Sequence, residues 1–322
     1  MAMNRRQFGL VALGSALALP ARAKPARAKA ALAGAQVPGI YRMKVGAFEI
    51  TALSDGWVPL DLKLFTGDPA AAAKLLERAF LPTDAVPTAV NEWVVNTGDS
   101  LVLVDTGTSN VFAPSLGRMA ANLQAAGVDP GTIDVVILTH LHPDHAGGLL
   151  TTEKKIAFPN ATIHVHDAEY GFWTSAEIYG KAPAESKGFF DIARQVVKPY
   201  ADGGRIATFK NNAEIRPGFN IMAAPGHTVG HSMVRVSSQG RELLIWGDIV
   251  HNAAIQFAEP ERAISFDTDQ AMAVASRKAV FDMVANDRLM IAGSHLPFPG
   301  IGHVSKTSSG YHYVPVPWSA DL

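Results

Sequence analysis

The stretch T-H-L-H-P-D-H-A-G-G, from Thr139 to Gly148, directly follows the apolar run of residues 133–138. A continuous apolar run of this length predicts a strand that is covered on both faces. Histidines and aspartates packed so densely after such a strand are costly to keep unless they bind something. Imidazole and carboxylate groups are donors that divalent metals accept. An incidental cluster in a surface loop is the alternative, and the position at the strand end disfavours it. The expected metal ligands in this stretch are His140, His142, Asp144 and His145.

Composition narrows the possible chemistry. The chain has 322 residues, of which 48% are hydrophobic, enough for one large domain or two small ones. Its formal net charge of −1 gives no indication of nucleic-acid binding or of an anionic membrane surface. Because the chain has no cysteine, any metal must be held by nitrogen and oxygen donors.

The N-terminus resembles an export signal. Residues 4–8, N-R-R-Q-F, form a twin-arginine pattern that is followed by the apolar residues 9–19 and by A-R-A at 21–23. We therefore expect residues 1–23 to be a twin-arginine signal peptide that directs the protein to the periplasm or outside the cell. A short membrane anchor is the alternative, but the apolar run is too short to span a bilayer. Residues 24–38 are expected to be a flexible leader.

Strand and helix patterns intermix along the rest of the chain. Strands are expected at residues 48–53, 91–96, 101–104, 133–138, 162–165, 220–223, 233–236 and 243–246. Helices are expected at residues 114–126, 168–175, 189–197 and 269–285. A turn is expected at S-D-G, residues 54–56. No linker or low-complexity segment follows residue 38. The pattern predicts one α/β domain with two sheets or one large sheet.

A site for two metals needs about seven ligands, so about three more must come from elsewhere in the chain. His227 lies in A-P-G-H-T-V-G-H-S, Asp248 in L-L-I-W-G-D, and His295 in L-M-I-A-G-S-H. Asp248 and His295 each directly follow an apolar strand pattern, and His227 lies in a polar loop beside one. Each residue alone would be weak evidence. Their matching positions next to strands favour a shared metal site.

These motifs together resemble the metallo-β-lactamase superfamily. The resemblance rests on H-x-H-x-D-H, on G-H-T-x-G-H-S, on the G-D after a strand and on the late G-S-H. It implies a single domain, residues 39–322, with a four-layer αβ/βα sandwich and metals at the edge between two sheets. Within the superfamily, L-V-L-V-D-T-G (101–107) and F-P-G-I-G-H (298–303) are similar to methyl parathion hydrolase and its lactone-hydrolysing relatives.

The resemblance also implies how the ligands are shared. One metal would be bound by His140, His142 and His227, and the other by Asp144, His145 and His295. Asp248 would bridge the two metals, and Asp144 and Asp248 would be the catalytic residues. Zinc is the expected metal, although manganese, iron and cobalt suit the same donors. Asp105 is expected to orient a metal-ligating histidine, and His231 to support His227 through a hydrogen bond. A homodimer is implied by the resemblance alone.

Two metals that share a solvent molecule can hold it as hydroxide, which predicts hydrolysis at a carbonyl or phosphoryl centre. No G-x-S-x-G motif suggests a serine nucleophile. The residues expected at the substrate pocket are Phe112, Trp173, Phe189, Phe190, His251, Ile264 and Phe266. Ordinary core packing is the alternative for the aromatic residues.

Small hydrophobic lactones, aryl esters and phosphotriesters would suit an apolar pocket. His251 stands where the organophosphate-hydrolysing relatives are expected to have a small apolar residue. A polar imidazole there would narrow the pocket and favour lactones or aryl esters, with phosphotriesters as a side reaction. An organophosphate hydrolase is the first alternative. A β-lactamase and a metal-binding protein without turnover are the others. No stable membrane insertion is expected.

Overall fold

The computed structural model describes residues 30–322. The expected signal peptide, residues 1–23, lies outside the described residues, so export by the twin-arginine route stays a prediction. Residues 30–37 are exposed and have no regular secondary structure. The chain from Pro38 to Leu322 forms one compact unit. Among the described helices, none is both long and apolar enough to cross a membrane.

The first of two sheets has seven strands in sequence order. They are β1 (Ile40–Val45), β2 (Phe48–Leu60), β3 (Val86–Asn96), β4 (Leu101–Val104), β5 (Val135–Ile137), β6 (Thr162–His166) and β7 (Ile206–Phe209). Strands β1 to β4 pair antiparallel, whereas β4 to β7 run parallel. The carboxyl ends of β4 and β5 therefore meet at one edge of the sheet.

The second sheet also has seven strands, in the order β14-β13-β12-β11-β10-β9-β8. They are β8 (Glu214–Arg216), β9 (Phe219–Ala223), β10 (Ser232–Ser238), β11 (Arg241–Ile245), β12 (Met290–Ala292), β13 (Ile301–Lys306) and β14 (Tyr311–Pro315). All neighbours pair antiparallel except β11 and β12, which are parallel. The carboxyl ends of β11 and β12 therefore also lie together.

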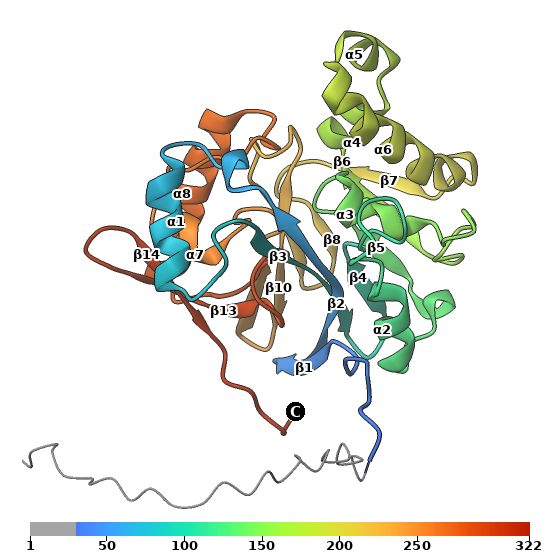
Figure 1. The fold of residues 1–322 in the computed structure, drawn as a ribbon. Helices are drawn as coiled ribbons and strands as arrows, with labels where there is room; N and C mark the ends of the chain where they lie inside the picture. Colours follow the sequence, from blue (N-terminus) through green and yellow to red (C-terminus); the bar gives the residue numbers. More distant parts are fainter. Residues whose placement is uncertain (1–29) are drawn as a thin grey trace, which may run out of the picture. The chain divides into compact units, whose positions relative to one another are not determined.

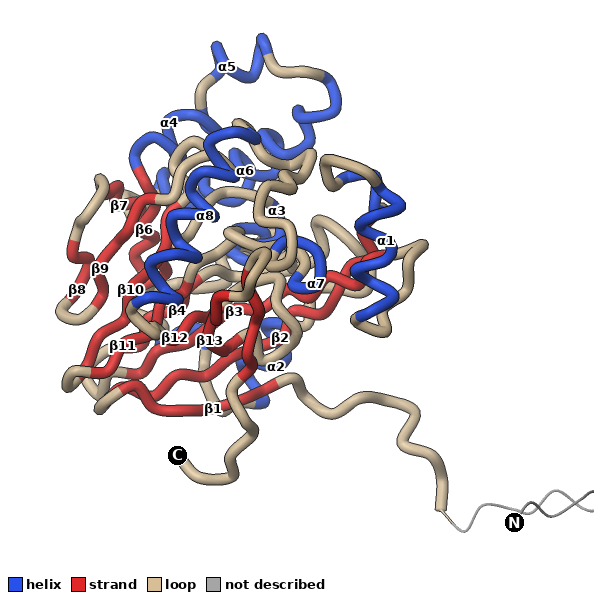
Figure 2. Tube along the Cα trace, turned by 90° about the vertical axis from the view of Figure 1, so that its left-hand side faces the viewer, coloured by secondary structure: helices blue, strands red, loops and turns tan. Residues whose placement is uncertain are grey.

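Helices cover the outer faces of both sheets (Figures 1 and 2). The helices of the described chain are α1 (Pro69–Arg78), α2 (Met119–Ala125), α3 (Pro143–Ala146), α4 (Asp167–Thr174), α5 (Ala176–Lys181), α6 (Ala184–Asp202), α7 (Ala253–Gln256) and α8 (Gln270–Asn286). Short 3-10 helices occupy η1 (Leu62–Leu64), η2 (Pro130–Thr132) and η3 (Gly147–Leu149).

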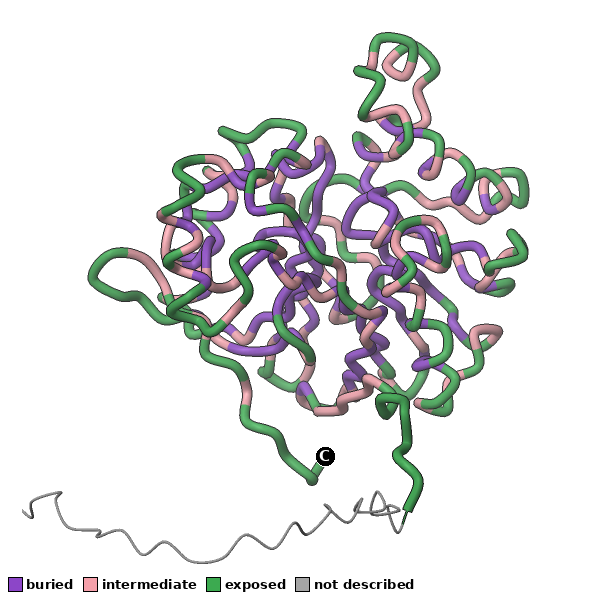
Figure 3. Tube along the Cα trace, in the orientation of Figure 1, coloured by how far each residue is buried: buried purple, intermediate pink, exposed green. Residues whose placement is uncertain are grey.

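Three apolar clusters define the layers. One lies between the sheets and joins Val95 of β3 and Ile137 of β5 to Val234 of β10. A second packs the outer face of the first sheet against α2, α4 and α6. A third packs the outer face of the second sheet against α8. Buried chain therefore runs through the middle of the unit while the helices expose their outer faces (Figure 3). The structure confirms the predicted single-domain α/β sandwich with two sheets.

Two local predictions were wrong. The helix expected at residues 114–126 begins only at Met119, and the expected turn at residues 54–56 lies inside β2, where a bulge separates Ser54 from Gly56. Both differences have one cause. The Asp55 carboxylate is fully buried and accepts hydrogen bonds from the backbone N–H groups of Gly117 and Met119 at 3.0 and 2.9 Å. A distant strand therefore caps this helix, which no local pattern could indicate.

Candidate metal centre

The H-x-H-x-D-H stretch changes backbone conformation in its middle. His142 is extended at the N-cap of α3, and Pro143 takes the first helical position, where its missing N–H costs nothing. Asp144 and His145 then lie on the helical turn. Gly148 lets this turn pack against the D-T-G loop after β4, because a Cβ atom there would lie 1.9 Å from the carbonyl oxygen of Thr106. Its N–H donates to the Gly107 carbonyl at 2.8 Å.

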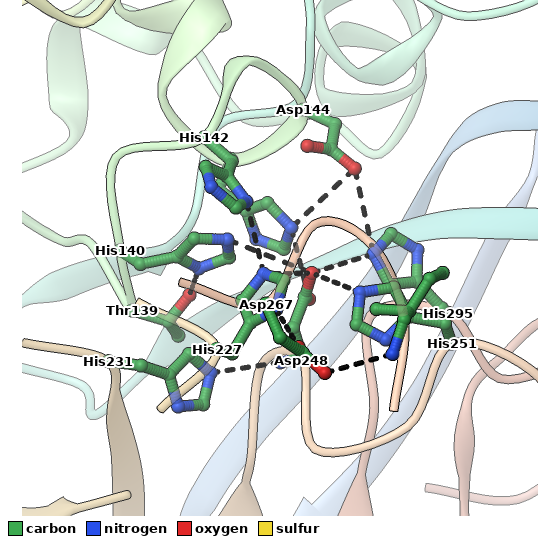
Figure 4. Close-up of polar contacts among 12 residues, drawn as sticks. Thr139, His140, His142, Asp144, His227, His231, Asp248, His251, Asp267 and His295 are labelled. Atoms are coloured by element: carbon green, nitrogen blue, oxygen red, sulfur yellow. Dashed lines mark hydrogen bonds and ion pairs between the residues drawn. The ribbon is translucent and has the colours of Figure 1, made fainter. Parts of the chain in front are cut away.

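The structure brings all seven expected ligands together at the edge between the sheets (Figure 4). One group of donor atoms joins His140, His142, His227 and Asp248, and another joins Asp144, His145 and His295. Asp248 lies between them. Its Oδ2 is 3.2 Å from His227 Nε2 and 3.0 Å from His295 Nε2, and its Oδ1 is 3.1 Å from His145 Nε2.

Protein acceptors fix which nitrogen faces the cluster in three of the histidines. His295 Nδ1 donates to the Ala89 carbonyl oxygen at 2.7 Å, since a carbonyl can only accept. His145 Nδ1 is 2.8 Å from the Asp105 carboxylate, and His227 Nδ1 is 2.8 Å from Asp267. The three Nε2 lone pairs therefore point toward the carboxylate oxygens of Asp248.

When these rings are neutral, acceptors face acceptors, and the arrangement needs positive charge between them, from protons on the rings or from bound cations. His140 Nε2, His145 Nε2 and Asp248 Oδ1 are buried without a hydrogen-bond partner among the described residues. Burial holds the pKa of His140 and His142 well below the usual range, which keeps them in the neutral form that binds metal. Burial opposes a charge on His145 as well, but Asp248, Asp144 and Asp105 raise its pKa well above normal. The donor set fits two divalent cations.

The contacts of Asp105 match the prediction for it. Besides His145, this carboxylate accepts from the backbone N–H and the hydroxyl of Thr139, both at 2.8 Å. Asp267 does the same for His227, a role that no sequence motif indicated. Its only sequence signal is a buried-strand-like context in I-S-F-D, forty residues after its partner.

The prediction for His231 was wrong in its partner. His231 forms no hydrogen bond to His227; their ring centroids are 5.8 Å apart. Its Nδ1 donates to the Ala224 carbonyl at 3.0 Å, and its Nε2 accepts from the backbone N–H of Asp248 at 3.0 Å. Burial lowers the pKa of His231 to about 3, so it stays neutral and can accept. It thereby positions the strand end that carries Asp248.

A second residue missed from the sequence, Glu169 of α4, ties two metal-binding loops together. It is fully buried and accepts from the N–H of Leu141 at 3.0 Å and from the N–H of Gly230 at 2.8 Å. The indole of Trp173 donates to the same carboxylate at 2.6 Å. The Trp173 ring in turn contacts the edge of His142, with centroids 5.4 Å apart. Glu169 therefore fixes the loop that carries His142 relative to the loop that carries His227.

A pocket opens directly above the cluster. Four of the expected pocket residues line it, namely Phe112, Phe189, His251 and Phe266, and Val58, Leu60 and Thr88 of the β2–β3 pair complete the wall. The other three expected residues are core residues instead. Trp173 and Phe190 pack against each other with ring centroids 4.5 Å apart. Ile264 is fully buried and forms an isolated β-bridge with Phe65.

Comparison with known proteins agrees with this geometry. The family model described as "Metallo-beta-lactamase superfamily" matches residues 85–295. The chain belongs to this superfamily. Together with the two groups of metal donors, this membership makes it a metallohydrolase with a binuclear centre.

Three relatives illustrate the similarity. The solved structure of the hydrolase AbOPH, of the beta-lactamase superfamily, has 35% identity and a TM-score of 0.84, covering 88% of this chain and 100% of that one. AidC, a dizinc quorum-quenching lactonase with bound product, has 29% identity and a TM-score of 0.82, covering 88% and 99%. A probable metallo-hydrolase of Mycobacterium tuberculosis is 25% identical over 233 residues, which are 63% of this chain and 73% of the relative.

Proposed function

We propose that this metallohydrolase opens small hydrophobic lactones and cleaves aryl esters, with phosphotriester hydrolysis as a side reaction. The observation that carries the proposal is the pocket above the metal donors. Its wall is mostly apolar, with Phe112, Phe189 and Phe266 on it, and the polar side chains of Thr88 and His251 also line it. Among the described residues, no lysine or arginine lines it, so the wall offers no cationic side chain to an anionic substrate.

Two divalent cations in the site would lower the pKa of coordinated water and polarise the substrate oxygen. The protein's own groups fix the geometry for this chemistry. Asp105, Asp267 and the Ala89 carbonyl orient three histidine rings, and Glu169 ties the loops that carry His142 and His227. The apolar wall limits the access of bulk water, which strengthens electrostatic interactions inside.

The similarity to AidC supports a lactone as substrate and zinc as metal. That protein is a dizinc lactonase whose structure contains the product N-hexanoyl-L-homoserine. The shared fold and the bound product of that relative favour a ring-opening reaction at this site. Burial lowers the pKa of His251 to about 4, so its imidazole is neutral at the pocket wall.

A substrate panel tests the proposal. Rates on dihydrocoumarin, an N-acyl homoserine lactone, methyl paraoxon and nitrocefin are measured with one metal-loaded preparation. We expect the highest kcat/KM on one of the two lactones. A higher value on methyl paraoxon would make phosphotriester hydrolysis the main activity, and a higher value on nitrocefin would favour a β-lactamase.

The substitution His251→Leu tests the reason for preferring lactones. Removal of the imidazole makes the wall more apolar, so the ratio of methyl paraoxon to dihydrocoumarin hydrolysis should rise by about 10-fold, or about 1.4 kcal/mol. Phe266→Leu serves as a control that changes size without removing a polar group. An unchanged ratio in His251→Leu would remove the argument for lactones.

A further inference from the structure

His251 has an unusual environment for a buried histidine. Its side chain is almost fully buried at the pocket wall, and neither ring nitrogen has a hydrogen-bond partner among the described residues. The backbone around it is fixed, because its N–H donates to Gln256 Oε1 at 2.6 Å. A buried imidazole without a partner loses the hydrogen bonds that it makes in water. Something in the functional protein is therefore expected to bind it.

A comparison of neighbouring histidines inside and outside the expected ligand set indicates what that partner is. His231, which is outside the expected ligand set, has both nitrogens satisfied by protein groups. His140 and His145, which are inside it, each have an Nε2 atom without a partner. His251 Nε2 shares this property with these two ligands and lacks the contacts of His231.

The position of the ring also matches a ligand (Figure 4). His251 Nε2 is 3.3 Å from Asp248 Oδ2, and its ring stacks on that of His295 with centroids 5.0 Å apart. Donor atoms of Asp248, His251 and His295 all lie within 4.8 Å of one another. Two of these three residues already belong to the expected ligand set.

We propose that His251 is an eighth protein ligand, to the cation held by Asp144, His145 and His295. That cation would then have five protein ligands, counting Asp248. Zinc sites commonly have four, whereas manganese, iron and cobalt accept more. His251 is the weakest ligand of the set, because no protein group at Nδ1 orients its ring. The inference rests on the binuclear centre of the proposed function and not on the substrate.

Proton NMR of the cobalt-loaded protein, without substrate, tests this inference. Each imidazole that binds cobalt gives a strongly shifted, exchangeable N–H resonance. The seven-residue set contains five histidines, so wild type should show six such resonances and His251→Leu should show five. His164→Leu is the matched control: His164 is half-buried on β6 and belongs to none of the described metal-donor groups, so this variant should keep all six.

Titration of the metal-free protein with cobalt gives a second readout. His251→Leu should bind the second equivalent about 10- to 100-fold more weakly than wild type, as should His251→Gln, which keeps a polar side chain. Five resonances in wild type, together with unchanged cobalt affinity in both variants, would overturn the inference. Because no lactone is present, this outcome is independent of the substrate panel.

Discussion

Two buried aspartates of this fold, Asp55 inside β2 and Asp248 after β11, have opposite surroundings. Asp55 accepts four hydrogen bonds, two from Thr108 and one each from the N–H groups of Gly117 and Met119. Asp248 faces the nitrogens of His145, His227 and His295, and its Oδ1 has no hydrogen-bond partner among the described residues. A carboxylate whose donors all come from the protein is a structural element. A carboxylate that faces other acceptors needs a cation.

The comparison predicts opposite effects for the two residues. Replacement of Asp55 should affect folding and leave the metals in place. Replacement of Asp248 should remove metal and activity. It should leave folding unharmed, because it removes a carboxylate that is buried without a cation in the metal-free protein, and such a charge is destabilising. The following substitutions test this difference, from the largest expected effect to the smallest.

Asp248→Ala should lower kcat/KM on dihydrocoumarin by about 1000-fold or more, which is about 4 kcal/mol of transition-state stabilisation. The metal content of the purified variant should fall below two ions per chain. In the metal-free state, its free energy of unfolding should match wild type or exceed it, because a buried carboxylate has been removed. An active variant that keeps two metals would disprove the bridging role.

Asp55→Ala should lower the free energy of unfolding by about 3 kcal/mol, because it leaves the buried N–H groups of Thr108 and Met119 and the half-buried N–H of Gly117 without acceptors. Denaturant unfolding of the metal-free protein measures this change. The metal content of the folded fraction should stay at the wild-type level. Asp55→Asn, which keeps one carbonyl acceptor, should lower the free energy of unfolding by less. A stable Asp55→Ala variant that lacks metal would reverse the assignment of the two aspartates.

Asp105→Asn should weaken binding of the metal at His145 by about 10- to 100-fold, because the acceptor that orients this ring loses its charge. Asp267→Asn is the matched substitution beneath His227, and it should weaken the other metal instead. Titration of each metal-free variant with zinc separates the binding of the first metal ion from the binding of the second. If both variants weakened the binding of the same metal ion, the assignment of His145 and His227 to different metals would fail.

The sequence predicted the metal donors because their positions are local. His140 to His145 lie within six residues, and Asp248 and His295 each follow a strand whose apolar pattern is visible. Asp55 was taken for a turn residue because its donors are 53 to 64 residues away. Glu169 was missed for the same reason, since it joins Leu141 and Gly230 only after folding.

The pocket wall was predicted only in part. Phe189 and Phe190 are adjacent on α6, yet Phe189 lines the pocket and Phe190 packs in the core. Neighbouring positions on a helix point in directions about 100° apart, so a chain segment near a site does not show which of its side chains face it. Reaction type could therefore be predicted from the ligand motifs, whereas substrate preference depends on side-chain directions that only the structure gives.

The central claim is that the acceptors around Asp248 hold two cations that hydrolysis requires. The most direct measurement combines metal analysis with dihydrocoumarin hydrolysis before chelation, after chelation and after stepwise return of zinc. We expect two metal ions per chain, loss of activity with their removal, and full recovery at two equivalents. Undiminished turnover by the metal-free protein would contradict the account.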